Sequence, residues 1–390
     1  MINKKISTLI LIVAVCALAS APVFAKEQPE DHKVIKQGNK KIYVAKDTKN
    51  ILADNVTASK INTYEGLIGY DWLSENEILV SKENKELDPI KNNLGEFKVQ
   101  NLYSYDLNSK KEKSIADKSK SQSYAISSPD KKHAFYVNDF EKENIGYITD
   151  SEGNIKVKIN EPHMDMADLT QAQWINNEEL IMPYMNIKGF YIVKLDGTSS
   201  KIENVEKEQM AIGDTSNFHS EALTNGMCIM NPVMVGDKIY YRTQKNEEKK
   251  MKVYDIKTKE TKEFINERVF NFKLSPDKKN FIIEVIQKDK ESNALIATDL
   301  NGEDMQTLAQ GYIFGESWSP DGTKVAYISN KMESEGVYVV DVKTGEKSLV
   351  SKGEYYAPVA WSPSGKKIMV HATEQKEGKT IDKTHIITLD

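Results

Sequence analysis

The chain has 390 residues, with 53 basic and 58 acidic side chains and a formal net charge of −5 at neutral pH. Arg242 and Arg268 are its only arginines, so nearly all of the basic residues are lysines. Nucleic-acid binding depends on a positive field and on bidentate arginine contacts. The composition therefore argues against a nucleic-acid partner.

Residues 1–25 have the features of an export signal. Two lysines precede an apolar run over residues 6–21, and the segment ends in Val23-Phe24-Ala25, a small-x-small cleavage pattern. The run is short for a membrane span, which needs about 20 residues. We expect cleavage, no stable membrane span afterwards, and an exported location that is secreted, cell-surface or periplasmic. Retention of the segment as an anchor is the alternative. After cleavage only Cys228 remains, so no internal disulfide forms.

One sequence phrase recurs along the mature chain. Its clearest copies are Trp318-Ser319-Pro320-Asp321-Gly322 and Trp361-Ser362-Pro363-Ser364-Gly365. In chain order the copies begin at residues 72, 127, 174, about 232, 274, 318 and 361, and the copy near Pro232 is the most eroded. The last three intervals are 42, 44 and 43 residues. This period is the length of one four-stranded propeller blade.

The chemistry of the phrase predicts a hairpin turn. Proline presets φ, Asp or Ser accepts hydrogen bonds from the turn amides, and Gly adopts the left-handed corner. The Trp then lies on the strand before the turn, and an apolar strand follows it. Third strands are expected at residues 103–108, 253–258, 295–300 and 336–342, each leading to a second turn and a short fourth strand. A large aromatic residue at one place in each blade is expected to pack between sheets rather than to bind a ligand.

These elements predict an all-β fold, a β-propeller of four-stranded blades. Seven copies favour seven blades, and six is the alternative if the copy near Pro232 is only an insertion. The last copy supplies three strands, while residues 41–45 and 50–53 look like outer strands without partners. An N-terminal strand is therefore expected to complete the last blade and close the ring. We assign residues 26–37 to a short linker and residues 38–390 to a single propeller domain.

The Trp-Ser-Pro-Asp-Gly phrase, followed by a Tyr-containing strand, resembles the repeat of TolB-like β-propellers and is similar to the propellers of prolyl oligopeptidase relatives. The resemblance covers roughly residues 40–390 and is weakest near Pro232. It implies a toroidal protein-interaction platform outside the cytoplasmic membrane. The separate N-terminal α/β domain of the family's namesake is not expected, because only about 15 residues separate the signal from the first expected strand.

A search for catalytic motifs yields no candidate. The stretch Gly315-Glu316-Ser317-Trp318-Ser319 lacks the final Gly of a nucleophile elbow, and no hydrolase domain is expected. The six histidines form no His-x-x-x-His pair, and the segment 163–168 is interpreted as a solvated acidic loop. No dinucleotide or phosphate-loop pattern occurs. We therefore expect no catalytic residue, metal or cofactor, and interpret the chain as a binding protein rather than an enzyme.

Partner binding is expected at the mouth of the central channel, on the segments that enter each inner strand, because loops on a rigid scaffold carry function. The candidates for contact with a protein, peptide or cell-wall polymer are Tyr70, Asp71, Asp168, Gln171, His219, Glu221, Asn271, Glu316, Tyr355 and Tyr356. Tyr124 enters the same mouth, but is expected to line or pack there.

The segment 206–231 is an insertion, and a short helix over 216–226 within it is a candidate recognition element. A tolerated loop expansion fits the sequence equally well. The alternative function is a glycan-active or glycan-binding protein that uses the mouth carboxylates Asp168, Glu221 and Glu316.

Overall fold

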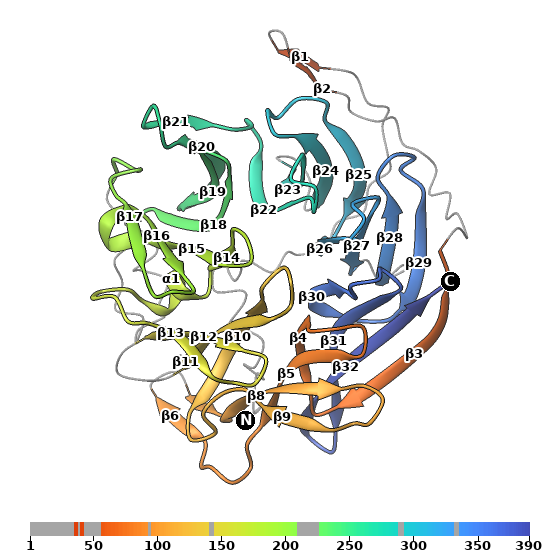
Figure 1. The fold of residues 1–390 in the computed structure, drawn as a ribbon. Helices are drawn as coiled ribbons and strands as arrows, with labels where there is room; N and C mark the ends of the chain where they lie inside the picture. Colours follow the sequence, from red (N-terminus) through yellow and green to blue (C-terminus); the bar gives the residue numbers. More distant parts are fainter. Residues whose placement is uncertain are drawn as a thin grey trace, which may run out of the picture.

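The computed structural model describes residues 35–37, 40–42, 56–92, 95–139, 144–208, 226–287, 292–330 and 335–390. Within these ranges, seven four-stranded antiparallel sheets follow one another around a ring, as Figure 1 shows. The predicted seven-bladed β-propeller is confirmed, and the eroded repeat near Pro232 forms a complete blade.

The first four blades, each given from inner to outer strand, are as follows. Blade 1 has β4 (Ile68–Trp72), β5 (Glu77–Glu83), β8 (Gln100–Asp106) and β9 (Glu112–Ser114); blade 2 has β10 (Ser121–Ser127), β11 (His133–Asp139), β12 (Ile145–Asp150) and β13 (Ile155–Ile159). Blade 3 has β14 (Gln173–Trp174), β15 (Glu179–Tyr184), β16 (Gly189–Lys194) and β17 (Ser199–Ile202); blade 4 has β18 (Cys228–Val235), β19 (Lys238–Lys245), β20 (Glu248–Asp255) and β21 (Glu260–Glu263).

The last three blades close the ring. Blade 5 has β22 (Arg268–Leu274), β23 (Asn280–Ile286), β24 (Asn293–Asp299) and β25 (Gln306–Gly311); blade 6 has β26 (Ile313–Trp318), β27 (Lys324–Ser329), β28 (Gly336–Asp341) and β29 (Lys347–Lys352); blade 7 has β30 (Tyr356–Trp361), β31 (Lys367–Lys376), β32 (Lys379–Leu389) and β3 (Ala58–Glu65). The strands nearest the centre are β4, β10, β14, β18, β22, β26 and β30. The remaining elements are the pairs β1 (Ile35–Gln37) with β2 (Lys40–Ile42) and β6 (Ile90–Asn92) with β7 (Gly95–Phe97), the helix α1 (Met166–Leu169) and the 3-10 turn η1 (Met185–Ile187).

An N-terminal strand closes the ring, as predicted, but it is β3 rather than the strand expected at residues 41–45 or 50–53. β3 pairs with β32 from Ala58 opposite Leu389 to Glu65 opposite Lys383. Residues 40–42 pair instead with β1, and residues 43–55 lie outside the described ranges. The hydrophobic pattern concealed β3 because it is an edge strand: Ile61 is 44% exposed, and five of its eight residues are exposed.

The turn chemistry is as predicted. In blade 6, Ser319 Oγ donates a hydrogen bond to Asp321 at 2.6 Å and accepts one from the Lys324 amide at 2.9 Å. The left-handed corner falls on Gly322, with φ of 70°. Lys131 and Lys278 take the same corner in blades 2 and 5, with φ of 64° and 59°, a conformation that L residues adopt only occasionally.

The repeat tryptophans hold adjacent blades together. The indole Nε1 of Trp72 donates to the Ala360 carbonyl at 3.0 Å, that of Trp318 to Lys273 at 3.2 Å, and that of Trp361 to Ser317 at 3.0 Å. Each acceptor belongs to the inner strand of the preceding blade. Trp72 is fully buried, while Trp318 and Trp361 are 8% and 7% exposed. Their packing role is therefore the one expected.

Candidate functional site

A β-bulge interrupts the inner strand of six blades at a similar level of the channel. The register shifts lie between the following pairs: Gly69/Asp71, Gln122/Tyr124, Met230/Val233, Val269/Asn271, Phe314/Ser317 and Tyr356/Ala360. A bulge places two residues opposite one and redirects a side chain that strict alternation would send elsewhere. The channel wall is thus built from residues that a period of two does not identify.

Neutral amides form a chain across blades 3, 4 and 5 at this level. The Asn231 backbone amide donates to Gln171 Oε1 at 3.3 Å, and its side-chain amide donates to Asn271 Oδ1 at 2.5 Å. The sequence analysis identified Gln171 and Asn271 but not Asn231, which joins them. Asn231 has φ of 50° and precedes a proline within a strand, and this Asn-Pro pair was the available signal.

Two buried carboxyl groups lie beside this chain. Glu316, on β26, is 3% exposed, and neither of its carboxyl oxygens has a hydrogen-bond partner among the described residues. Glu284, on β23, is 1% exposed, pairs with Asn271 across the strands, and accepts a hydrogen bond from the Asn293 side chain. Burial raises the pKa of both carboxyl groups, and the neighbouring Glu316 raises the pKa of Glu284 further.

The sequence analysis identified Glu316 but missed Glu284. The missed signal is a single acid inside the apolar strand Phe281-Ile282-Ile283-Glu284-Val285. Arg242 and Lys249 lower the pKa of Glu284, and Lys273 lowers that of Glu316, each by less than burial raises it. Two carboxyl groups and three cations are therefore gathered where blades 4, 5 and 6 meet.

Two further predicted carboxylates, Asp168 and Asp71, are bonded within the scaffold. Asp168 is 1% exposed and accepts hydrogen bonds from the amides of Met185, at 3.1 Å, and Asp165, at 3.2 Å. Burial, followed by the nearby Asp165 carboxylate, raises the pKa of Asp168. Asp71 accepts hydrogen bonds from Ser127 and forms an ion pair with Lys131 at 3.2 Å. These contacts link blade 1 to blade 2. Both carboxylates therefore have structural partners within the propeller.

The predicted aromatic contacts divide into core and half-buried residues. Tyr124 is 9% exposed, and its hydroxyl donates to the Ala172 carbonyl at 3.1 Å, so it packs as expected. Tyr355 is 6% exposed and bonds Ser351, so it also belongs to the core. Tyr70 and Tyr356 are half-buried, and the Tyr356 hydroxyl donates to Glu354 at 2.6 Å. His219 and Glu221, with the helix expected over 216–226, fall mostly within 209–225, outside the described residues.

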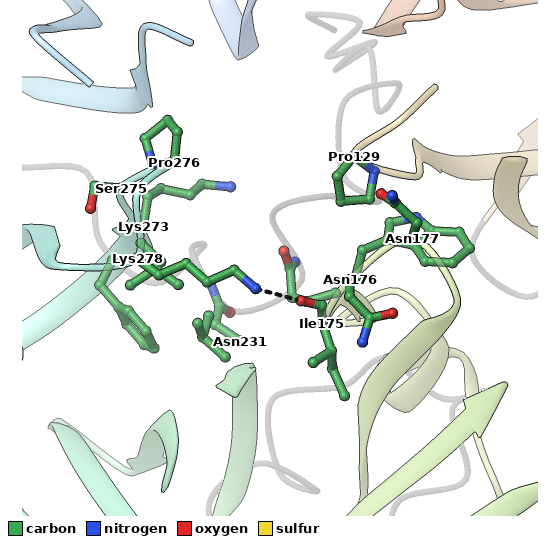
Figure 2. A pocket seen from close by; sticks show the side chains of 14 residues that line it. Pro129, Ile175, Asn176, Asn177, Asn231, Lys273, Ser275, Pro276 and Lys278 are labelled. Carbon is green, nitrogen blue, oxygen red and sulfur yellow. Dashed lines mark hydrogen bonds between the residues drawn. The ribbon is translucent and has the colours of Figure 1, made fainter. Parts of the chain in front are cut away.

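A pocket of about 500 Å³ opens at the other end of the channel, where the inner strands finish and the repeat turns begin. Figure 2 shows blade 5 residues facing blade 3 residues across it, with Lys278 bonded to Ile175. The sequence analysis did not identify this pocket. Among the described residues, no group of three His, Cys, Asp or Glu side chains is arranged to hold a metal ion, and no helix is long and apolar enough to cross a membrane.

The ring of seven four-stranded blades around a channel with polar groups in its wall defines the class of the protein, a seven-bladed β-propeller. Within this class, the chain belongs to the family of the TolB β-propeller domain, whose model matches residues 184–388, just over half of the sequence.

Curated relatives match a short part of the chain. The Tol-Pal system protein TolB of Xylella fastidiosa (strain M12) is 37% identical over 60 residues, which is 15% of this chain and 14% of the relative. The protein of the same name from Chromobacterium violaceum is 38% identical over 74 residues, 18% of this chain and 17% of the relative. These alignments span less than one-fifth of the relatives' own length.

Solved structures share the fold over most of the chain. An oligogalacturonate lyase in complex with manganese superposes with a TM-score of 0.56 at 12% identity, covering 85% of this chain and 91% of that one. The β-propeller domain of Myceliophteria thermophila Cps50 (Swd1) superposes with a TM-score of 0.53 at 11% identity, covering 84% and 99%. At such identities the likeness concerns the fold alone.

Proposed function

We propose that this chain is an exported, non-enzymatic propeller that serves as a binding scaffold for a protein or other ligand at the cell envelope. Its membership of the TolB β-propeller family and the export features of residues 1–25 support this proposal. A protein partner is the form we test first, with a peptide or a cell-wall polymer as the further candidates.

One observation carries the non-enzymatic part of the proposal. Two of the acids expected at the mouth are engaged in the scaffold: Asp168 receives two backbone amides, and Asp71 joins two blades. General acid–base chemistry needs carboxyl groups that reach the substrate. The half-buried groups that remain at the mouth, Tyr70, Gln171 and Tyr356, suit contact rather than catalysis.

A photocrosslinking experiment in the producing cells tests this proposal. The amino acid p-benzoylphenylalanine is placed at position 356, at the mouth, or at position 258, in an exposed turn between β20 and the outer strand β21 of blade 4. We expect one protein to be captured from position 356 and not from position 258, with loss of capture when purified mature chain is added as a competitor. Equal capture from both positions, or none from 356, contradicts the mouth as the binding surface.

Export is tested in the same cells. We expect the extracytoplasmic fraction to contain a chain whose mass corresponds to residues 26–390, because the small-x-small pattern ends at Ala25. Recovery of the full 390-residue chain in the membrane fraction would favour an uncleaved anchor. A chain confined to the cytoplasm would contradict the envelope scaffold altogether.

A glycan-active protein is the second candidate, and the buried pair Glu284 and Glu316 favours it. Paired acids of perturbed pKa are typical of catalytic sites. Both side chains are, however, closed off from solvent, at 1% and 3% exposure, and neither lines the pocket at the repeat turns. We expect no new reducing ends from oligogalacturonate or from peptidoglycan fragments. Release of such ends by the wild-type chain, and its loss in Glu316→Gln, would establish this candidate instead.

A further inference from the structure

We infer that the pocket at the repeat-turn end of the channel binds a carboxylate group on an acidic peptide segment of a partner protein. The pocket extends from Asn231, which is bonded to the mouth residues Gln171 and Asn271, to the repeat turns of blade 5. The inference rests on the proposed role as a protein binder and adds a contact surface that is tested separately from capture at position 356.

The pocket exists because the repeat is eroded in blade 4. Two residues separate the last paired positions of its inner hairpin, Val235 and Lys238, whereas six separate Leu274 and Phe281 in blade 5. The Ser-Pro-Asp turn that borders the channel in blade 5 therefore has no counterpart in blade 4. Asn231 and Val233 of blade 4 line the pocket, but its turn does not.

The side chains that line the pocket carry positive charge, whereas the whole chain is negative. Lys273 and Lys278 are the only charged residues among the described side chains that line it, although the chain carries a net charge of −5. Both lysines are exposed. In Figure 2 the Lys278 side chain extends from blade 5 toward blade 3, where its Nζ donates to the Ile175 carbonyl at 3.0 Å.

Blade 2 shows how the same lysine position is neutralised elsewhere in the ring. Lys131 occupies the left-handed corner of the blade 2 turn, as Lys278 does in blade 5. Its Nζ forms an ion pair at 3.2 Å with Asp71, on the inner strand of the preceding blade. An acid on one blade thus neutralises the turn lysine of the next.

In blade 4 a valine takes the place of that acid. Asp71 pairs with Leu79, two residues after Glu77, whose own partner is Asp106, the last residue of β8. Val233 pairs with Tyr240, two residues after Lys238, whose partner is Asp255, the last residue of β20.

The two registers match, so Val233 stands where Asp71 stands. Lys278 consequently donates to a carbonyl, whereas Lys131 is paired with a carboxylate.

Trp174, which lines the pocket, carries a buried donor that has no acceptor. The Trp174 indole Nε1 is buried without a hydrogen-bond partner, whereas the equivalent indoles of Trp72, Trp318 and Trp361 each donate to a neighbouring blade. An unpaired buried donor is destabilising, so a ligand acceptor that displaced its cover and reached it would gain affinity. Trp174 and Lys278 both line the pocket.

The rest of the lining favours a peptide over a sugar. Ile175, Val233, Leu274, Pro129 and Pro276 offer aliphatic surface to a side chain beside the acid. Phe272, the other aromatic of the lining, is 1% exposed and presents no open ring face on which a sugar would stack. The volume of about 500 Å³ accommodates a short segment rather than a whole domain.

The test uses a fluorescein-labelled peptide, Leu-Glu-Leu-Glu, and its Leu-Gln-Leu-Gln counterpart, titrated with the mature chain by fluorescence anisotropy. We expect the Glu peptide to bind at least tenfold more tightly than the Gln peptide, because a hydrogen bond from the Lys278 ammonium to a carboxylate is stronger than one to a neutral amide. Raising the ionic strength to 0.5 M should weaken the binding.

Three variants locate the site. Lys278→Met should weaken the Glu peptide about tenfold or more, and Val233→Asp should do the same by supplying the internal carboxylate that blade 1 has. Lys279→Met is the matched control: it makes the same charge change in the same turn, at a residue that does not line the pocket, and should alter the affinity less than twofold. Melting curves of each variant confirm that the propeller is folded.

Several results would overturn the inference. These are no binding of the Glu peptide up to millimolar concentration, unchanged binding by Lys278→Met, or an equal loss in Lys279→Met, which would indicate a bulk charge effect. Tri-galacturonate or inorganic phosphate that binds more tightly than the peptide, with the same dependence on Lys278, would assign the pocket to a different anion. If the wild-type chain does not bind the Glu peptide but a partner is still captured from position 356, the inference about this pocket is wrong and the proposed function stands.

Discussion

Replacing the repeat tryptophans with phenylalanine separates their hydrogen bond from their packing. Trp72 is fully buried and donates to the Ala360 carbonyl at 3.0 Å, across the joint between blades 1 and 7. Trp72→Phe removes this donor and leaves the acceptor without it, which costs about 1–3 kcal/mol beyond the loss of packing. Trp174→Phe is the matched control, since its Nε1 has no acceptor to lose.

We therefore expect Trp72→Phe to lower the free energy of unfolding by about 1–3 kcal/mol more than Trp174→Phe does. Trp318→Phe and Trp361→Phe should resemble Trp72→Phe, because both indoles donate to the preceding blade. Truncation to alanine at Trp72 should cost about 3–5 kcal/mol. Urea unfolding followed by circular dichroism measures these differences. If Trp174→Phe is as destabilising as Trp72→Phe, the hydrogen bond between blades is not what distinguishes these positions.

The remaining predictions concern ring closure and buried charge. A chain that begins at residue 66 should melt well below one that begins at residue 56, because only the longer chain contains β3. A synthetic peptide of residues 56–66 should raise the melting temperature of the shorter chain by adding the missing strand. Equal melting temperatures of the two chains would exclude closure by β3. Glu316→Gln should stabilise the fold at pH 8 relative to wild type and lose this advantage near pH 4. The reason is that burial raises the pKa of Glu316 in the folded state. The contribution of the protonated Glu316 to stability is present below the unfolded pKa and is lost as the pH rises through the folded pKa. If the stability difference between Glu316→Gln and wild type does not change with pH, this account of Glu316 is wrong. Asp71→Asn should destabilise the joint between blades 1 and 2 by removing the ion pair with Lys131, and the double variant Asp71→Asn with Lys131→Met should cost less than the sum of the two single variants.

The fold was predictable because its signals are local. Each Ser-Pro-Asp turn is built within six residues, as the bonds of Ser319 to Asp321 and Lys324 illustrate. A period of about 43 residues then implies blades, and blades with a tryptophan on the inner strand imply a ring. The closing strand was misplaced because β3 has one exposed isoleucine in place of an apolar pattern. Its position depends on pairing with β32, more than 300 residues away.

The candidate sites were only partly predictable, and the reason is again the distance over which the contacts form. Sequence indicated that Glu316, Asn271 and Gln171 lie near the channel, since each adjoins or belongs to an inner strand. Asp71 and Asp168 looked like free mouth carboxylates, but contacts with Lys131 and Met185 engage both.

Sequence by itself thus determined the repeat and the turn chemistry, which follow from neighbouring residues, and favoured seven blades over six. Only the tertiary structure decided which polar groups are engaged in holding the blades together and which are left unpaired. Lys131 and Lys278 occupy the same place in the same turn, and the residue that distinguishes them, Asp71 or Val233, lies on a different blade. The charge of a propeller channel therefore depends on which blades the ring brings side by side.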